Sequence, residues 1–181
     1  LRETVAILKD SARALAYANS MGIVHRDIKP DNILLTGSAA VVTDFGVAKA
    51  VSAGRDRGVT YGQTITGVGI SLGTPQYMAP EQAGGEVVDH RADLFSLGSV
   101  MYAMCTGRSP FSGNATINVL RQIADEEPPP IRQINSEIPA WLVEIDERLH
   151  EKNPGDRLQT AHEVADLLAG HLAHLQQPAV V

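Results

Sequence analysis

The sequence predicts an α+β protein that is mainly α-helical and carries one short β-hairpin. Three observations lead to this fold class. Apolar residues recur at helical spacing over residues 1 to about 20, an apolar stretch of helix length covers residues 93–105, and two short apolar runs flank a turn at residues 36–38. With 181 residues, of which 44% are hydrophobic, the chain can bury a core as one domain.

Composition argues against several classes of protein. The single cysteine, Cys105, permits no internal disulfide, and no apolar run approaches the roughly 20 residues of a membrane span. Both observations fit a cytoplasmic setting. The net charge of -6 and the lack of a basic stripe argue against non-specific binding to nucleic acid. The chain begins in mid-helix at Leu1 without an initiator methionine, which favours a piece of a longer protein, and that parent could carry a membrane anchor.

The first third of the chain is expected to hold one helix and the hairpin. The apolar face of the helix comprises Val5, Leu8, Ala12, Leu15 and Ala16. Gly22 is suited to end this helix, because glycine adopts the left-handed conformation of a C-cap without strain. The hairpin strands, residues 33–35 and 40–43, flank Thr36-Gly37-Ser38 and return Asp44 beside Asn32.

The remaining elements are expected to be helices. Residues 93–105 are apolar on all sides, as in a buried central helix that Gly107 ends. Asn114 is expected to cap a helix running to Ala124. A helix from Pro139 should bury Leu142, Ile145, Leu149 and Trp141. Thr160 and Glu163 form a capping-box pattern before the last helix, whose face with His162, His171 and His174 is expected to be solvated.

The residues with the clearest chemistry lie in the stretch HRDIKPDN, from His25 to Asn32. Asp27 offers a carboxylate that can accept a hydroxyl proton, and Lys29 offers a cation for phosphate oxygens. Asn32 offers an amide oxygen for a hard metal ion. A second carboxylate, Asp44, follows at the end of the hairpin. This combination of a base, a cation and metal ligands predicts a phosphoryl-transfer loop.

Three motifs in order extend this interpretation. HRDIKPDN is followed by Asp44-Phe45-Gly46 and by Ala79-Pro80-Glu81. The sequence here resembles the protein kinase family, in which these motifs are the catalytic loop, the magnesium-binding DFG and the closing APE. Residues 73–78 resemble the shelf on which the substrate of these kinases lies, which makes Thr74 a candidate catalytic-site residue. Lys29 and Thr74 resemble the serine/threonine branch of that family, and TPQYMAPEQ is similar to bacterial kinases of eukaryotic type.

The resemblance covers nearly the whole chain and implies the C-terminal lobe of a protein kinase. It assigns residues 1–177 to this lobe, with a catalytic loop at 25–32, an activation segment at 44–81 and a short tail at 178–181. The glycine-rich loop, the strand lysine and the helix glutamate of the N-terminal lobe have no counterpart in the sequence. The chain alone is therefore expected to be inactive as a kinase.

The family implies roles for the matched residues. Asp27 would deprotonate a serine or threonine hydroxyl of a protein substrate, and Lys29 would neutralise the phosphoryl group in transfer. Asn32 and Asp44 would hold Mg²⁺ on the phosphates of ATP, while Leu34 would form the floor under adenine. Supporting positions matched to the family motifs are His25, Phe45, Gly46, Asp93 (a hydrogen-bond acceptor for the loop backbone), and the Glu81–Arg157 ion pair.

Regulation is also implied by the resemblance. Arg26 would bind a phosphorylated activation segment, because a phosphate supplies charge and acceptor oxygens for a guanidinium. Counting back from Glu81 places Thr66 where related bacterial kinases carry an activating threonine, with Thr64 and Ser71 as the next candidates. Asp31, next to Asn32, would favour basic side chains on the peptide or is a plain turn residue.

Three functions from different classes fit these motifs. The first is a serine/threonine protein kinase, favoured by the intact set Asp27, Lys29, Asn32 and Asp44. The second is a non-catalytic binding module of kinase fold. The third is a small-molecule phosphotransferase of kinase-like fold, which the arginine of HRD and the APE segment disfavour. Nucleotide binding by a longer chain would separate them.

Overall fold

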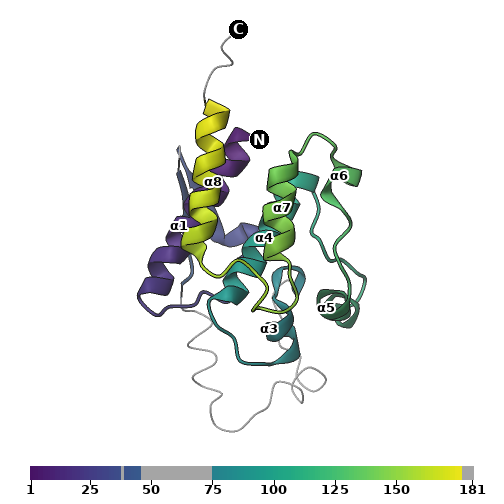
Figure 1. Ribbon diagram of the computed structural model, residues 1–181. Coiled ribbons are helices and arrows are strands. Elements are labelled where there is room, and N and C mark those ends of the chain that lie inside the picture. The colour runs from purple at the N-terminus through teal and green to yellow at the C-terminus, as the bar shows by residue number, and fades with distance from the viewer. Residues whose placement is uncertain (38, 46–74, 177–181) are drawn as a thin grey trace.

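The computed structural model describes residues 1–37, 39–45 and 75–176. These residues form a mainly helical fold with one two-stranded antiparallel sheet (Figure 1), so the predicted fold class is confirmed. The elements, in chain order, are α1 (Arg2–Ser20), η1 (Pro30–Asn32), β1 (Ile33–Thr36), β2 (Ala39–Val42), η3 (Pro75–Tyr77), α3 (Pro80–Gly84), α4 (Arg91–Thr106), α5 (Thr116–Asp125), α6 (Ile131–Ile134), α7 (Ala140–Leu149) and α8 (Ala161–Gln176). Among them, no helix is both long and apolar enough to cross a membrane.

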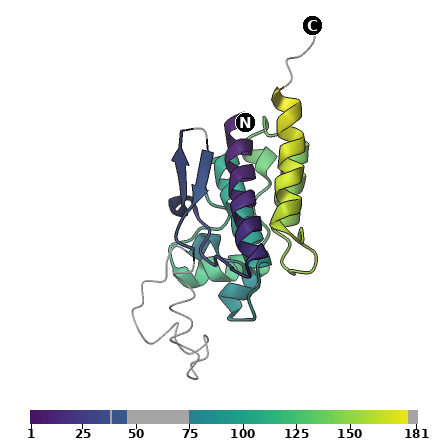
Figure 2. The same cartoon turned by 90° about the vertical axis from the view of Figure 1, so that its left-hand side faces the viewer.

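Helix α1 lies between the hairpin on one side and α8 on the other (Figure 2). Its buried face is the apolar stripe of the sequence, with Val5, Leu8, Ala12 and Leu15 fully buried. The helix ends as predicted, with Gly22 at φ +72°. The N–H of Ile23 donates to the carbonyl of Ala18 at 2.9 Å, which closes a Schellman motif. This turn leads the chain from α1 directly into His25.

Helix α4 runs through the centre of the fold and is buried on nearly all sides, as predicted. It begins two residues before Asp93 and ends at Gly107, which has φ +76°. Gly98 allows α7 to approach closely, since a Cβ atom there would lie 2.9 Å from the Cβ of Leu149. The element that carries Asp93 is therefore held rigidly in the core.

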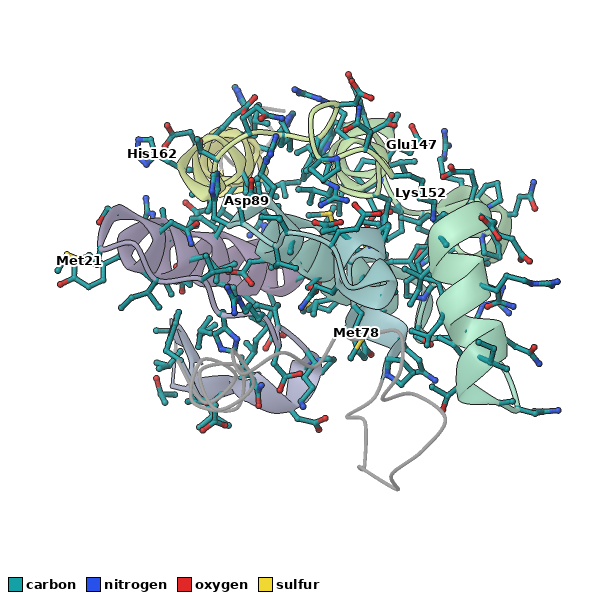
Figure 3. All side chains as sticks on the ribbon, turned by 90° about the horizontal axis from the view of Figure 1, so that it is seen from below. Met21, Met78, Asp89, Glu147, Lys152 and His162 are labelled. Atoms are coloured by element: carbon teal, nitrogen blue, oxygen red, sulfur yellow. The ribbon has the colours of Figure 1, made fainter. Side chains whose placement is uncertain are left out.

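The contact between α5 and the segment after α7 depends on Lys152 (Figure 3). Its Nζ donates to the carbonyls of Ile123 at 2.9 Å and Glu126 at 2.7 Å, which lie in the last turn and at the C-cap of α5. The same ammonium lies 4.6 Å from the centre of the Phe111 ring. Burial lowers the pKa of Lys152. Lys152 thus fixes the end of α5 against the core.

Two of the expected helix details were wrong. Asn114 does not cap α5, because the helix begins at Thr116 and Ala115 occupies the N-cap position. The start of α5 carries no side-chain cap, and its buried face of Val119, Leu120 and Ile123 holds it in place. Trp141 is half-buried at the rim of the core, where its ring stacks on that of His171 with centroids 3.9 Å apart.

The N-terminus of α8 forms half of the predicted capping box. The N–H of Glu163 donates to Oγ1 of Thr160 at 3.1 Å. The carboxylate of Glu163 accepts from the N–H of Gln159 at 3.2 Å, one residue before the expected donor. His162 points to solvent at this end of the helix (Figure 3). Within the described ranges no group of three His, Cys, Asp or Glu residues is placed to hold a metal ion.

Candidate active site

The loop between α1 and β1 brings Asp27, Lys29 and Asn32 together. Nζ of Lys29 lies 2.8 Å from Oδ2 of Asp27. Nδ2 of Asn32 donates to the same Oδ2 at 3.2 Å and to the backbone carbonyl of Asp27 at 2.7 Å. Asn32 is buried, whereas the side chain of Asp27 is 51% exposed. The carboxylate is thus held from within the protein and open to a ligand from solvent.

His25, at the start of this loop, is fully buried, and its ring bonds to two backbone groups. Its Nδ1 accepts from the N–H of Asp27 at 3.2 Å, and its Nε2 donates to the carbonyl of Thr43 at 2.7 Å. These partners assign the ring proton to Nε2. The ring also meets that of Phe45 edge-on, with centroids 4.7 Å apart. His25 therefore joins the catalytic loop to the segment that carries Asp44.

Asp93 on α4 binds the backbone at the start of the loop. Its Oδ2 accepts from the N–H of His25 at 2.8 Å, and its Oδ1 accepts from the N–H of Arg26 at 2.7 Å. Burial raises the pKa of Asp93, and the hydrogen bonds from Arg26 and His25 act in the opposite direction. These two bonds help to hold Arg26 at φ +68°, a left-handed conformation that non-glycine residues rarely adopt.

The hairpin delivers Asp44 to Asn32. Ile33 pairs with Val42 in the sheet, and the N–H of Thr43 donates to the carbonyl of Asn32 at 2.9 Å. Asp44 is the next residue along, is exposed and has φ +63°. Since Nδ2 of Asn32 is bonded to Asp27, its Oδ1 is the atom left for a metal. An amide oxygen and a carboxylate are hard donors, and they suit Mg²⁺, which takes few protein ligands and completes its shell with phosphates and water.

Leu34, on β1 next to this site, is 51% exposed. Val41, which pairs with Leu34 across the hairpin, is also an exposed apolar residue. The hairpin thus offers an apolar surface beside the polar residues of the loop, and a flat aromatic group such as a purine can pack on such a surface.

Glu81 and Arg157 form a buried ion pair at the far side of α3. Nη1 of Arg157 lies 2.7 Å from Oε1 of Glu81, and Nη2 lies 2.8 Å from Oε2. The other N–H groups of the guanidinium donate to the carbonyls of Arg91, Glu151 and Lys152. The predicted ion pair is therefore present, and it fixes α3 to the segment between α7 and α8.

A family model for the protein kinase domain matches residues 2–168. The chain belongs to the protein kinase family. It is 38% identical over 172 residues to serine/threonine-protein kinase PknB of Mycolicibacterium smegmatis, an alignment that covers 94% of this chain and 26% of that protein. It is 37% identical over 179 residues to serine/threonine-protein kinase PknA of Mycobacterium tuberculosis, covering 98% of this chain and 39% of that protein. The chain thus spans about a quarter of the length of its PknB relative.

Several predicted residues of this kinase lobe lie outside the described residues. They are Gly46, Thr64, Thr66, Ser71 and Thr74, and residue 177 and the predicted tail at 178–181 are outside as well. The roles predicted for them, and the domain boundary at 177, stay predictions. Arg26 is described, and its backbone lies between Asp93 and α3, but its predicted role in binding a phosphate is likewise a prediction.

One residue at the site was missed in the sequence. Nε2 of Gln82, on α3, donates to the backbone carbonyl of Arg26 at 2.9 Å across 56 residues of chain. Its position directly after the APE motif was visible in the sequence, but no local pattern distinguishes a glutamine that makes such a contact from an exposed one.

Proposed function

We propose that this chain is the catalytic-loop and substrate-binding lobe of a serine/threonine protein kinase. The observation that supports this most is the convergence of Asp27, Lys29 and Asn32, with Lys29 at 2.8 Å from the exposed carboxylate. In the reaction, the substrate hydroxyl oxygen bonds to the γ-phosphorus of ATP while the bond from that phosphorus to ADP breaks. Asp27 accepts the hydroxyl proton, and the phosphate ester is the product.

The two oxygens of Asp27 have different tasks in this proposal. Oδ2 accepts hydrogen bonds from Lys29 and Asn32, which fix the plane of the carboxylate. Oδ1 has no hydrogen-bond partner among the described residues and is the oxygen that would accept the proton of the substrate hydroxyl. On substrate binding, Lys29 can turn its ammonium from Asp27 to the phosphoryl oxygens, because a lysine side chain is flexible and its three N–H donors rotate freely.

Asn32 and Asp44 are the residues that would hold Mg²⁺. The ion, when bound with ATP, neutralises charge on the phosphate oxygens. Two hydrogen bonds to Asp27 hold Asn32 in a fixed position. Asp44 adds an exposed carboxylate. Leu34 would contact the adenine. The nucleotide site also needs the N-terminal lobe that the family uses to cover the phosphates.

The assignment to serine and threonine rests on Lys29, on Thr74 and on the relatives, which are serine/threonine-protein kinases. The substrates would be proteins with exposed serine or threonine side chains. Lys29 lies beside the exposed carboxylate of Asp27, which is the arrangement of a base next to a cation that a protein kinase needs. Among the described residues, no observation favours a non-catalytic module or a small-molecule phosphotransferase over this function.

The test compares Asp27→Asn with Asp31→Asn in a complete kinase domain containing this chain. Both remove one exposed carboxylate from the same loop, so charge and position are matched. Loss of a general base lowers turnover by roughly 100- to 10,000-fold, and we expect this for Asp27→Asn alone. Asp31→Asn should change rates by a few fold at most, through preference for basic peptides. Equal turnover in the two variants would remove Asp27 from the mechanism.

The 181-residue chain by itself should transfer no measurable phosphate, because positioning provides most of the catalysis and half of the phosphate clamp belongs to the other lobe. The assay incubates the purified chain with labelled ATP, Mg²⁺ and a serine peptide. The complete domain is the positive control. Transfer by the isolated chain at a rate near that of the complete domain would contradict this part of the proposal.

Activation would come from phosphorylation at Thr66, with Thr64 and Ser71 as further sites. A phosphate brings about -1.5 to -2 charges next to Arg26, which precedes Asp27 directly. Thr66→Ala and Arg26→Ala are each expected to lower turnover of the complete kinase. The double variant should lose less than the two single effects combined, because both act through the same contact. Mapping of phosphates by mass spectrometry gives the sites. Full activity after loss of all three hydroxyls would refute this mode of activation.

A further inference from the structure

Gln82 lies where α3 meets the catalytic loop, and its side-chain amide is bonded at both ends. Oε1 accepts from the N–H of Ala79, the residue before α3, at 3.0 Å. Nε2 donates to the carbonyl of Arg26 at 2.9 Å. The amide thus links the first turn of α3 to the residue that precedes Asp27.

The carbonyl of Arg26 and the N–H of Asp27 belong to the same peptide group, which is planar. Gln82 holds the carbonyl end of this plane, and Nδ1 of His25 accepts from its N–H end at 3.2 Å. With both ends bonded, the plane cannot turn. Its orientation fixes the direction in which the side chain of Asp27 leaves the backbone.

Arg26 needs such support because its backbone is in a conformation that is costly for a non-glycine residue, with φ +68°. Asp93 holds the N–H on one side of its Cα at 2.7 Å. Gln82 holds the carbonyl on the other side. Loss of either bond gives the backbone a route to relax towards an ordinary conformation, which would rotate Asp27.

The anchor at the other end is firm. Glu81, the residue before Gln82, is buried and paired with Arg157 at 2.7 Å, so α3 cannot follow a movement of the loop. We propose that Gln82 is a positioning residue for phosphoryl transfer: its amide, braced by α3, orients the Arg26–Asp27 peptide and so aims the base. This rests on the proposed function for its catalytic consequence, but the contact itself can be tested without activity.

The first experiment measures kinetics of Gln82→Glu in the complete kinase domain. Glutamate has the same shape and keeps the acceptor for Ala79, but it replaces the donor to Arg26 by a carboxylate oxygen that repels the carbonyl. The matched control is Gln122→Glu on α5, where the glutamine also accepts a backbone N–H, that of Ser112 at 3.0 Å. We expect kcat of Gln82→Glu to fall roughly 10- to 100-fold, as for a misplaced catalytic group, and the KM for ATP to stay within about two-fold.

The second experiment needs no activity and uses the 181-residue chain. Amide exchange of Asp27, read by NMR, should become faster by about ten-fold or more in Gln82→Glu, since its peptide plane is released. The amide of Leu15, in the core of α1, should not change. The Gln122→Glu variant should match wild type at both positions.

The outcomes distinguish the inference from the proposed function. Faster exchange at Asp27 in the 181-residue Gln82→Glu variant, together with no kinase activity in the complete wild-type domain, would keep the positioning contact and refute the function. An active wild type whose Gln82→Glu variant retains kcat within two-fold would overturn the inference. So would an equal fall of kcat in Gln122→Glu, or faster exchange at Leu15 as well as Asp27, because the effect would then be general loss of stability.

Discussion

Removal of one partner of the Glu81–Arg157 pair should destabilise the lobe strongly. In Glu81→Ala, the guanidinium of Arg157 stays buried, with 2% of the residue exposed, and loses two hydrogen bonds of 2.7 and 2.8 Å. Its three bonds to backbone carbonyls remain but cannot neutralise its charge. Breaking a buried pair costs about 3–5 kcal/mol. A typical domain has about 5–15 kcal/mol of stability, so the loss is a large part of the total.

The matched control is Arg121→Ala at the exposed pair Arg121–Glu126, where the charged atoms lie 3.5 Å apart and the side chains are 69% and 50% exposed. Such a pair contributes about 0–1 kcal/mol. Glu81→Gln is the milder variant. It keeps one acceptor oxygen for Arg157 but leaves a buried charge without its counter-ion, so we expect an intermediate loss.

The measurement is urea unfolding of the 181-residue chain, followed by circular dichroism and by fluorescence of Trp141, the single tryptophan. The double variant Glu81→Ala/Arg157→Ala should be less destabilised than the sum of the single variants, because no charge is left stranded. A free energy of unfolding for Glu81→Ala within 1 kcal/mol of the Arg121→Ala value would refute the reasoning from burial.

Three further predictions concern the core. Burial raises the pKa of Cys105 from 9.0 to about 12, so the thiol should resist alkylation in the folded chain. The folded state binds this proton more tightly, so the stability it provides is complete below pH 9 and is lost as pH rises towards 12. At pH 10 the loss is roughly 1 kcal/mol, and the urea midpoint of Cys105→Ala should lack this fall with pH. Gly98→Ala should destabilise by roughly 1–3 kcal/mol through its clash with Leu149, whereas Gly170→Ala, in open space on α8, should stabilise by roughly 0.5–1 kcal/mol in the same unfolding assay. Asp93→Asn should lower the free energy of unfolding by about 1–3 kcal/mol, because an amide has one oxygen for two N–H donors, and an unchanged value would contradict the assigned contacts.

The sequence by itself determined the elements whose signals are local. The apolar stripe of α1, the glycine that ends it and the hairpin around residues 36–38 follow from side-chain periodicity and backbone preference, and these forces act within a few residues. The motif at His25–Asn32 also identified the site, because the chemistry needs its base, cation and amide within one loop. Local signals were weaker at α5, where packing of the buried face set the start of the helix rather than Asn114.

Contacts between distant residues depended on the tertiary structure. Periodicity and spacing alone do not pair Asp93 with the backbone of His25 across 68 residues, or Glu81 with Arg157 across 76, and family resemblance was needed to expect them. Gln82 and Arg26 were not expected to meet at all.

The buried polar network of the core is a similar case. His150 follows the last turn of α7, a position typical of an exposed cation, but it is buried with Nδ1 3.1 Å from Asp146 and Nε2 3.2 Å from Ser99 on α4. Burial raises the pKa of Asp146, and His150 lowers it. The ring of His150 can be buried because Asp146 on the same helix and Ser99 on α4 both lie within hydrogen-bond distance of its nitrogens. Ser99 is brought there by the packing of α4 against α7, so only the folded chain decides this contact.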